Sequence, residues 1–176
     1  MERWDIRNER GEITGKTVVR GNVRLGPGEY HLVVHIWIVG SDGRLLIQRR
    51  ANDKELMPGE WAATGGSAVT GEDSVHAAMR ELQEELGLAV PASQMHFIRR
   101  LTRKNSFVDI WMAQADTPAE KLRLQASEVS DAKWIWPMDL LRMVREGGFH
   151  NYGKDYFDII INAAGRIVKT PAGQKG

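Results

Sequence analysis

The chain has 176 residues, of which 42% are hydrophobic and 27% are charged, and its formal net charge is +1. This length favours a single domain, residues 1–176, with enough apolar residues for a substantial core. The composition excludes a disordered chain. A net charge near zero is not typical of a nucleic-acid-binding protein, so no nucleic acid partner is expected.

Most of the chain has the pattern of β-strands separated by turns. Runs rich in β-branched and aromatic residues are bounded by clusters of Gly, Asn, Asp and Ser. The expected strands are residues 4–6, 16–19, 31–39, 44–50, 61–63, 67–69, 95–103, 107–115 and 132–136. The first two form a hairpin within an N-terminal extension, residues 1–29. The hairpin of residues 31–39 and 44–50 is expected to be central.

Three segments carry apolar residues at the three- and four-residue spacing of a helix. They are residues 74–86, 137–145 and 152–168. The first has clear end signals, because Asp73 or Ser74 can cap its N-terminus and Gly87 suits a left-handed residue just past its end. Residues 170–176 are expected to be a flexible tail. Strands interleaved with a few helices predict an α/β (α+β) fold, a mixed sheet covered on its faces by helices.

The sequence carries no sign of export or membrane insertion. The stretch Met1 to Arg7 lacks the apolar core of a signal peptide, and no segment approaches membrane-spanning length. The sequence also contains no cysteine, so it has neither disulfides nor a thiol nucleophile, which fits a reducing compartment. We therefore expect a cytoplasmic protein with no membrane partner.

The helix of residues 74–86 carries a cluster of acidic residues. At about 100° per residue, Glu81, Glu84 and Glu85 fall on one side of the helix, with Arg80 at the margin. Carboxylates at this spacing repel one another, and a bound cation removes that repulsion. Magnesium and manganese prefer carboxylate, carbonyl and water oxygens. The same pattern taken alone is also that of a solvated acidic face.

A glycine-containing loop precedes this helix. Gly65, Gly66 and Gly71 mark a stretch where the backbone can turn tightly or approach a ligand closely. Such a loop can offer a carbonyl oxygen to a metal ion, and we expect Gly65 to do so.

The stretch of residues 66–88 resembles the signature of the Nudix hydrolase family. The matching residues are Gly66, Glu72, Arg80, Glu81, Leu82, Glu84, Glu85, Gly87 and Leu88. The resemblance implies the Nudix fold, in which a mixed β-sheet is sandwiched between α-helices. It also implies a metal-dependent pyrophosphohydrolase that cleaves a diphosphate linkage in a nucleoside diphosphate derivative or a nucleoside triphosphate. The implied cofactor is Mg²⁺ or Mn²⁺, and the implied partner is a small-molecule diphosphate.

The resemblance also implies roles for individual residues. Glu81, Glu84 and Glu85 are expected to bind one to three metal ions. Glu81, Glu84 and Arg80 are expected to be catalytic residues. The general base stays open between a glutamate of the signature and a carboxylate outside it, for which Glu128 is the candidate.

The stretch of residues 31–66 is similar to type I isopentenyl-diphosphate isomerases, which share the fold. Arg50 and Lys54 match positions that contact the diphosphate in the isomerases, so we expect them to bind substrate. From the Nudix signature, Gly66 and Glu72 are expected to support the site.

Two other functions stay open. An isomerase is disfavoured, because the isomerases use an essential cysteine just before a Gly-His pair, where this chain reads Thr64-Gly65-Gly66-Ser67. The other is a non-catalytic nucleotide-binding module, although such modules commonly lose the signature carboxylates and this chain keeps all three. Relatives with added N-terminal strands often dimerise, so a homodimer is one expected assembly.

Overall fold

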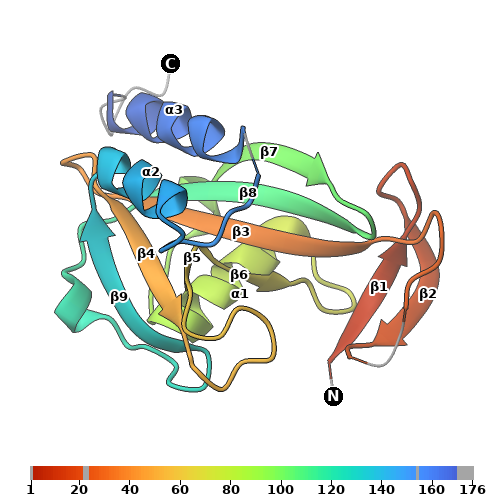
Figure 1. Ribbon diagram of the computed structural model, residues 1–176. Helices are drawn as coiled ribbons and strands as arrows, with labels where there is room; N and C mark the ends of the chain where they lie inside the picture. Colours follow the sequence, from red (N-terminus) through yellow and green to blue (C-terminus); the bar gives the residue numbers. More distant parts are fainter. Residues whose placement is uncertain (1, 22–23, 154, 170–176) are drawn as a thin grey trace.

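The computed structural model describes residues 2–21, 24–153 and 155–169 (Figure 1). The expected flexible tail, residues 170–176, lies outside these described residues. Within the described ranges, no helix is long and apolar enough to cross a membrane.

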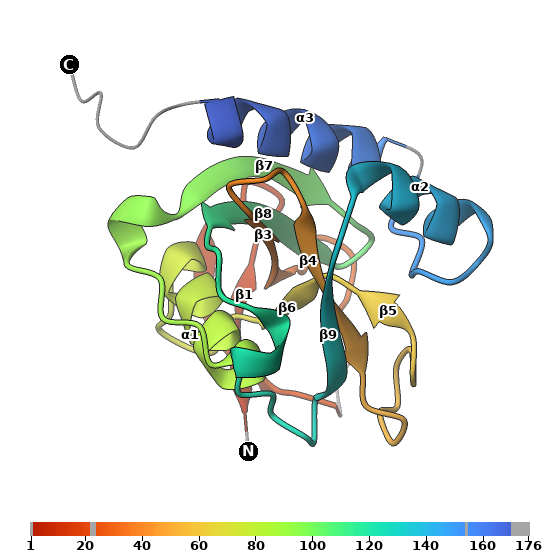
Figure 2. The ribbon, with the colours of Figure 1, turned by 90° about the vertical axis from the view of Figure 1, so that its left-hand side faces the viewer.

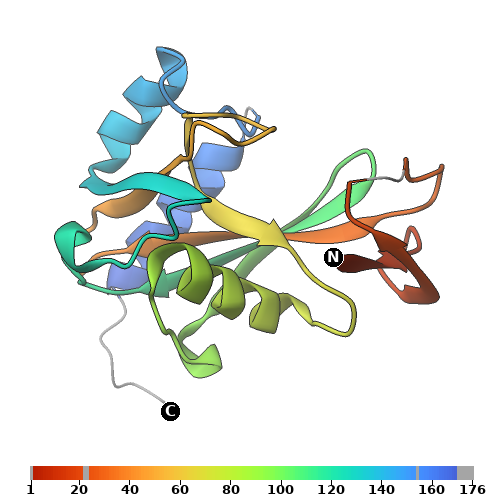
Figure 3. The ribbon, with the colours of Figure 1, turned by 90° about the horizontal axis from the view of Figure 1, so that it is seen from below.

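A mixed β-sheet lies between two layers of helices. Its strands are β3 (His31–Val39), β4 (Leu45–Arg50), β5 (Trp61–Ala62), β6 (Thr64–Ser67), β7 (His96–Thr102), β8 (Ser106–Gln114) and β9 (Val129–Ile135). The helices are α1 (Ser74–Leu86), α2 (Pro137–Arg145) and α3 (Tyr156–Lys169), with short 3-10 turns at Ala92–Gln94 and Ala119–Lys121. Helix α1 packs on one face of the sheet (Figure 3), and α2 and α3 pack on the other (Figure 2). The expected fold, a mixed sheet sandwiched between helices, is confirmed.

Strand β3 is the centre of the sheet, as predicted. It runs parallel to β8 along its whole length, and its other edge pairs antiparallel with β6 and then with β4. Because side chains alternate across a strand, Leu32, Val34 and Ile36 enter the core under α1, whereas Trp37 and Val39 enter the core under α2 and α3. The hairpin with β4 is short, and the main partner of β4 is β9.

Helix α1 has the bounds that its sequence predicts. Its N-cap is Asp73 rather than Ser74, because the Asp73 carboxylate accepts a hydrogen bond from the His76 amide at 2.9 Å. Its C-cap is Gly87, whose φ of 67° is the left-handed conformation that favours glycine. The apolar side of the helix is buried, and it carries Glu85 into the protein with it.

The N-terminal hairpin forms a separate two-stranded sheet beside the start of β3 (Figure 1). Its strands are β1 (Arg3–Arg7) and β2 (Ile13–Val19). This hairpin is tied to the loop between β6 and α1. The Thr70 amide donates to the Arg3 carbonyl at 2.9 Å, and the Gly71 amide donates to the Asp5 carboxylate at 2.8 Å. The hairpin therefore holds the loop that leads into α1.

Four predicted elements differ from their expected bounds by three residues or more. Strand β2 begins at Ile13 rather than at residue 16, and β9 begins at Val129 rather than at residue 132. The strand expected at residues 67–69 lies instead at Thr64–Ser67, because Gly65 and Gly66 pair with β3 through their backbones although glycine signals a loop. The last helix begins at Tyr156 rather than at residue 152, since Gly153 has a φ of 115°, which is not helical.

His35 on β3 makes stability dependent on pH. Its ring lies against Tyr152 and Tyr156, and burial lowers its pKa from 6.5 to about 3, with nearby Arg103 and His150 adding to the effect. The unfolded chain therefore binds the proton more tightly. We expect this histidine to reduce the free energy of unfolding as the pH falls from 6.5 towards 3, by at most about 1.4 kcal/mol per pH unit.

Urea unfolding between pH 7 and pH 5 measures this effect. As the pH falls, the free energy of unfolding should decrease less for His35→Gln than for the wild type. His96→Gln changes an exposed histidine on β7 and is the matched control, for which no such shift is expected. Parallel pH profiles for the wild type and His35→Gln would contradict the prediction.

Candidate functional site

The acidic side of α1 faces a polar cleft with a volume of about 110 Å³. The cleft is lined by Glu2, Arg20, Arg50, Gly65, Gly66, Arg80, Glu81, Glu84, Glu85, Gln125 and Glu128. This set brings together eight of the predicted site residues from β4, β6, α1 and the loop before β9. The two others, Glu72 and Lys54, each bind a residue of this lining.

Arg80 organises the acidic cluster. Its guanidinium binds both oxygens of Glu72 at 2.9 and 3.0 Å, and it also donates to Glu81 and Glu84 at 2.9 Å each. A further hydrogen bond of 3.1 Å reaches the carbonyl of Ser67 at the end of β6. The hydrogen bonds to Glu72, followed by the charge of Glu81, raise the pKa of Arg80, so it stays charged. Arg80 therefore fixes the positions of two candidate metal ligands relative to the loop.

The two glycines of β6 allow close approach on both sides: Gly66 to α1 and Gly65 to β3. A Cβ atom on Gly66 would overlap the carboxylate of Glu81, and a Cβ atom on Gly65 would overlap the carbonyl oxygen of Val34. The Glu81 carboxylate thus occupies the space that a side chain at position 66 would need. Burial raises the pKa of Glu81, and the charge of Arg80 opposes that rise.

Glu85 is the most buried of the three helix carboxylates that line the cleft, with 3% of its surface exposed. Its Oε2 atom accepts hydrogen bonds from the Gln48 amide at 3.0 Å and from the Gly65 backbone at 3.3 Å. Both donors are neutral, and burial raises the pKa of Glu85 to about 8, with the charge of Glu81 adding to the rise. Carboxylate oxygens are the ligands that a hard divalent cation prefers. Among the described residues, no three such side chains are grouped closely enough to hold an ion as they stand, because Glu81 and Glu84 are turned to Arg80.

A second ion pair lies across the cleft from α1. The Lys54 amine is 2.6 Å from Oε1 of Glu128, so Lys54 reaches the cleft through this glutamate. Arg50 lines the cleft itself, and its Nε donates to the carbonyl of Leu56 at 2.9 Å. Of the two residues that the sequence predicts to bind substrate, Arg50 and Lys54, only Arg50 lines the cleft itself.

Sequence reasoning missed four residues of this site: Glu2, Arg20, Gln48 and Gln125. Glu2 and Arg20 form an ion pair of 2.7 Å on the N-terminal hairpin. Nothing local in the sequence places that pair beside α1. Gln48 left only a weak signal, because it follows the apolar run Leu45-Leu46-Ile47 and precedes two arginines.

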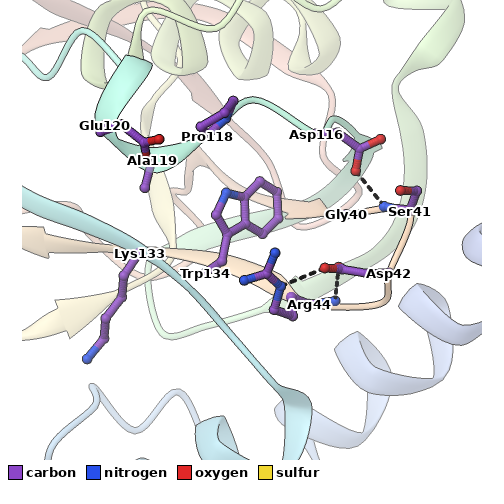
Figure 4. Close-up of a pocket in the computed structure, with 10 residues that line it drawn as sticks. All are labelled: Gly40, Ser41, Asp42, Arg44, Asp116, Pro118, Ala119, Glu120, Lys133 and Trp134. Atoms are coloured by element: carbon purple, nitrogen blue, oxygen red, sulfur yellow. Dashed lines mark hydrogen bonds and ion pairs between the residues drawn. The ribbon is translucent and has the colours of Figure 1, made fainter.

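A larger hollow, of about 560 Å³, lies at the other end of β4 and β9 (Figure 4). Several of its polar groups are already engaged in hydrogen bonds or ion pairs. Asp42 pairs with Arg44 at 2.7 Å, Asp116 accepts from the Ser41 amide at 2.7 Å, and the Trp134 indole donates to a backbone carbonyl. The smaller cleft, with its crowded carboxylates, is therefore the candidate active site.

The chain is similar to several known proteins. A family model of the NUDIX domain matches residues 29–152. An uncharacterized Nudix hydrolase of Listeria monocytogenes is 42% identical over 153 residues, which cover 86% of this chain and 90% of that protein. An isopentenyl-diphosphate Δ-isomerase of Kocuria rhizophila is 29% identical over 160 residues, 84% of this chain and 85% of that one. A solved Deinococcus radiodurans structure matches with a TM-score of 0.76 and 26% identity, covering 93% and 99% of the two chains.

Proposed function

Since the chain belongs to the Nudix hydrolase family, we propose that it is a metal-dependent pyrophosphohydrolase of a nucleoside diphosphate derivative or a nucleoside triphosphate. Members of this family hydrolyse phosphorus-containing anhydrides and generally use divalent cations. The observation that carries the proposal is that Glu81, Glu84 and Glu85 line one cleft, with Glu85 almost removed from solvent. Such a cluster suits a divalent cation, and a cation bound there would neutralise the negative charge of a diphosphate.

In this proposal Glu81, Glu84 and Glu85, with the carbonyl of Gly65, hold Mg²⁺ or Mn²⁺. A bound ion supplies charge neutralisation of the diphosphate and a water molecule of lowered pKa. Arg80 contributes by holding Glu81 and Glu84 in place and by limiting the repulsion between them.

Residues outside α1 complete the proposed chemistry. Glu128 is the candidate general base, and its ion pair with Lys54 fixes one of its oxygens. The other oxygen is then the one that would accept a proton from the attacking water. Arg50 would donate to a phosphate oxygen of the substrate, because charge-assisted bonds from guanidinium groups suit phosphate. Lys54 would contribute to substrate binding indirectly, because its ion pair holds Glu128 at the cleft.

A substrate panel tests the proposal. It contains ADP-ribose, nucleotide sugars, dinucleoside polyphosphates, normal and oxidised nucleoside triphosphates and isopentenyl diphosphate, each with Mg²⁺ or Mn²⁺. We expect release of phosphate or nucleotide from at least one nucleotide, and its loss when the metal is chelated. If metal binds and nothing is cleaved, the hydrolase proposal fails and a nucleotide-binding module takes its place.

Isopentenyl diphosphate in the panel addresses the isomerase alternative. The isomerases carry their cysteine just before a Gly-His pair, and Gly65 is the residue before the corresponding pair, Gly66-Ser67. A side chain at position 65 would overlap the carbonyl of Val34. We therefore expect no isomerised product. Light scattering of the same preparation measures the mass in solution and tests the homodimer prediction.

A further inference from the structure

Gln48 is a polar residue inside a buried strand. It is 1% exposed, and the preceding residues of β4 are apolar and buried. Burying an amide is costly unless its donors and acceptors are satisfied. Among the described residues, none makes a hydrogen bond to its Oε1 atom, and its Nε2 atom reaches the Ala63 carbonyl at a long 3.4 Å. An apolar side chain of the same size would fill this place without the unpaired oxygen, so stability does not explain the amide.

The partner that remains is Glu85. The Nε2 atom of Gln48 lies 3.0 Å from Oε2 of Glu85. The orientation of the amide is fixed by the Ala63 carbonyl, which can only accept a hydrogen bond and therefore faces Nε2. The Gly65 amide donates to the same Oε2 atom at 3.3 Å. Two neutral donors, one from β4 and one from β6, therefore hold one oxygen of Glu85 and leave Oε1 outside these bonds.

We propose that Gln48 is a positioning residue, which holds Oε2 of Glu85 so that Oε1 is presented to a divalent cation in the cleft. The inference rests on the proposed function, in which Glu85 is a metal ligand. A neutral donor suits this place. A carboxylate would repel Glu85, and a lysine would neutralise Glu85 and compete with the metal. Partners that orient metal-binding side chains commonly contribute tenfold to a hundredfold to metal affinity.

The test compares the wild type with Gln48→Met, which keeps the length of the side chain and removes the amide. Two quantities are measured: Mn²⁺ affinity by electron paramagnetic resonance, and the free energy of unfolding of the metal-free protein in urea. We expect the dissociation constant for Mn²⁺ to rise about tenfold to a hundredfold. The stability of the metal-free protein should be unchanged or higher, since an unpaired buried oxygen is removed.

Gln83→Met is the matched control, because it makes the same chemical change on the exposed side of α1. It should change neither quantity. Gln48→Leu, a second variant, guards against a packing defect caused by methionine alone. If both variants at position 48 are less stable and bind Mn²⁺ as the wild type does, Gln48 has a structural role and the inference is wrong.

Failure of the inference can be told apart from failure of the proposed function. If the wild type binds Mn²⁺ and Glu85→Gln does not, Glu85 is a ligand, and the variants at position 48 alone decide the inference. If the wild type does not bind Mn²⁺, the metal site itself is disproved and the inference falls with it.

Discussion

Replacing Glu85 by Gln is expected to reduce metal-dependent turnover by about a hundredfold or more. The substitution keeps the shape of the side chain and its two hydrogen bonds, and it removes the negative charge that would bind the cation. The effect should appear in kcat and in Mn²⁺ affinity together, which initial rates and titration of Mn²⁺ measure. Glu120→Gln, at an exposed position of the 3-10 turn Ala119–Lys121, is the control and should leave both unchanged.

The same variant is expected to make the metal-free protein more stable at pH 8. Glu85 has a pKa of about 8 in the folded protein, against 4.5 for an ordinary glutamate, so the folded state holds the proton more tightly. Glu85 therefore lowers stability as the pH rises from 4.5 to 8. Removing it should add up to about 4 kcal/mol to the free energy of unfolding at pH 8. A variant that is both fully active and no more stable would contradict the role proposed for Glu85.

Gly66→Ala is expected to reduce turnover by about tenfold or more while the protein stays folded, with a stability change below about 1 kcal/mol. The new Cβ atom would occupy the place of the Glu81 carboxylate. That carboxylate is the end of a flexible side chain, so it can move aside at low cost in stability. Moving it, however, displaces a proposed metal ligand. Steady-state kinetics and urea unfolding of the variant measure the two effects.

Gly65→Ala provides the contrast, one residue away. Its Cβ atom would overlap the backbone of Val34 in the central strand, which cannot move without disturbing the pairing of β3 with β6. We expect a loss of about 3 kcal/mol in the free energy of unfolding. Equal destabilisation by the two alanine substitutions would show that Gly66 has a structural role and does not serve to make room for Glu81.

Local signals predicted the part of the molecule that carries the chemistry. The bounds of α1, its cap at Gly87 and the gathering of Glu81, Glu84 and Glu85 all follow from spacing within one short segment. Periodicity did not predict the burial of Glu85. Position 85 lies between the apolar side of the helix and its acidic side, and only the packing of β4 and β6 against it excludes solvent.

The rest of the site depends on pairing between distant segments. Glu128 reaches the cleft because β9 pairs with β4. The sequence predicts instead that β4 pairs mainly with β3, and that pairing is short. The sequence does not predict a strand at Gly65 and Gly66, because the pairing of these residues with β3 depends on backbone groups and on the absence of side chains. A pattern of side chains carries little information about such a strand.

The N-terminal hairpin gives the cleft a wall that comes from outside the main sheet. It forms its own sheet, it lies outside the matched residues 29–152, and it contributes Glu2 and Arg20 to the lining. Neither residue belongs to a strand of the main sheet, but both lie close enough to Glu81 for their charges to interact with it. The acidic helix and the N-terminal hairpin thus line the same cleft from two separate parts of the sequence.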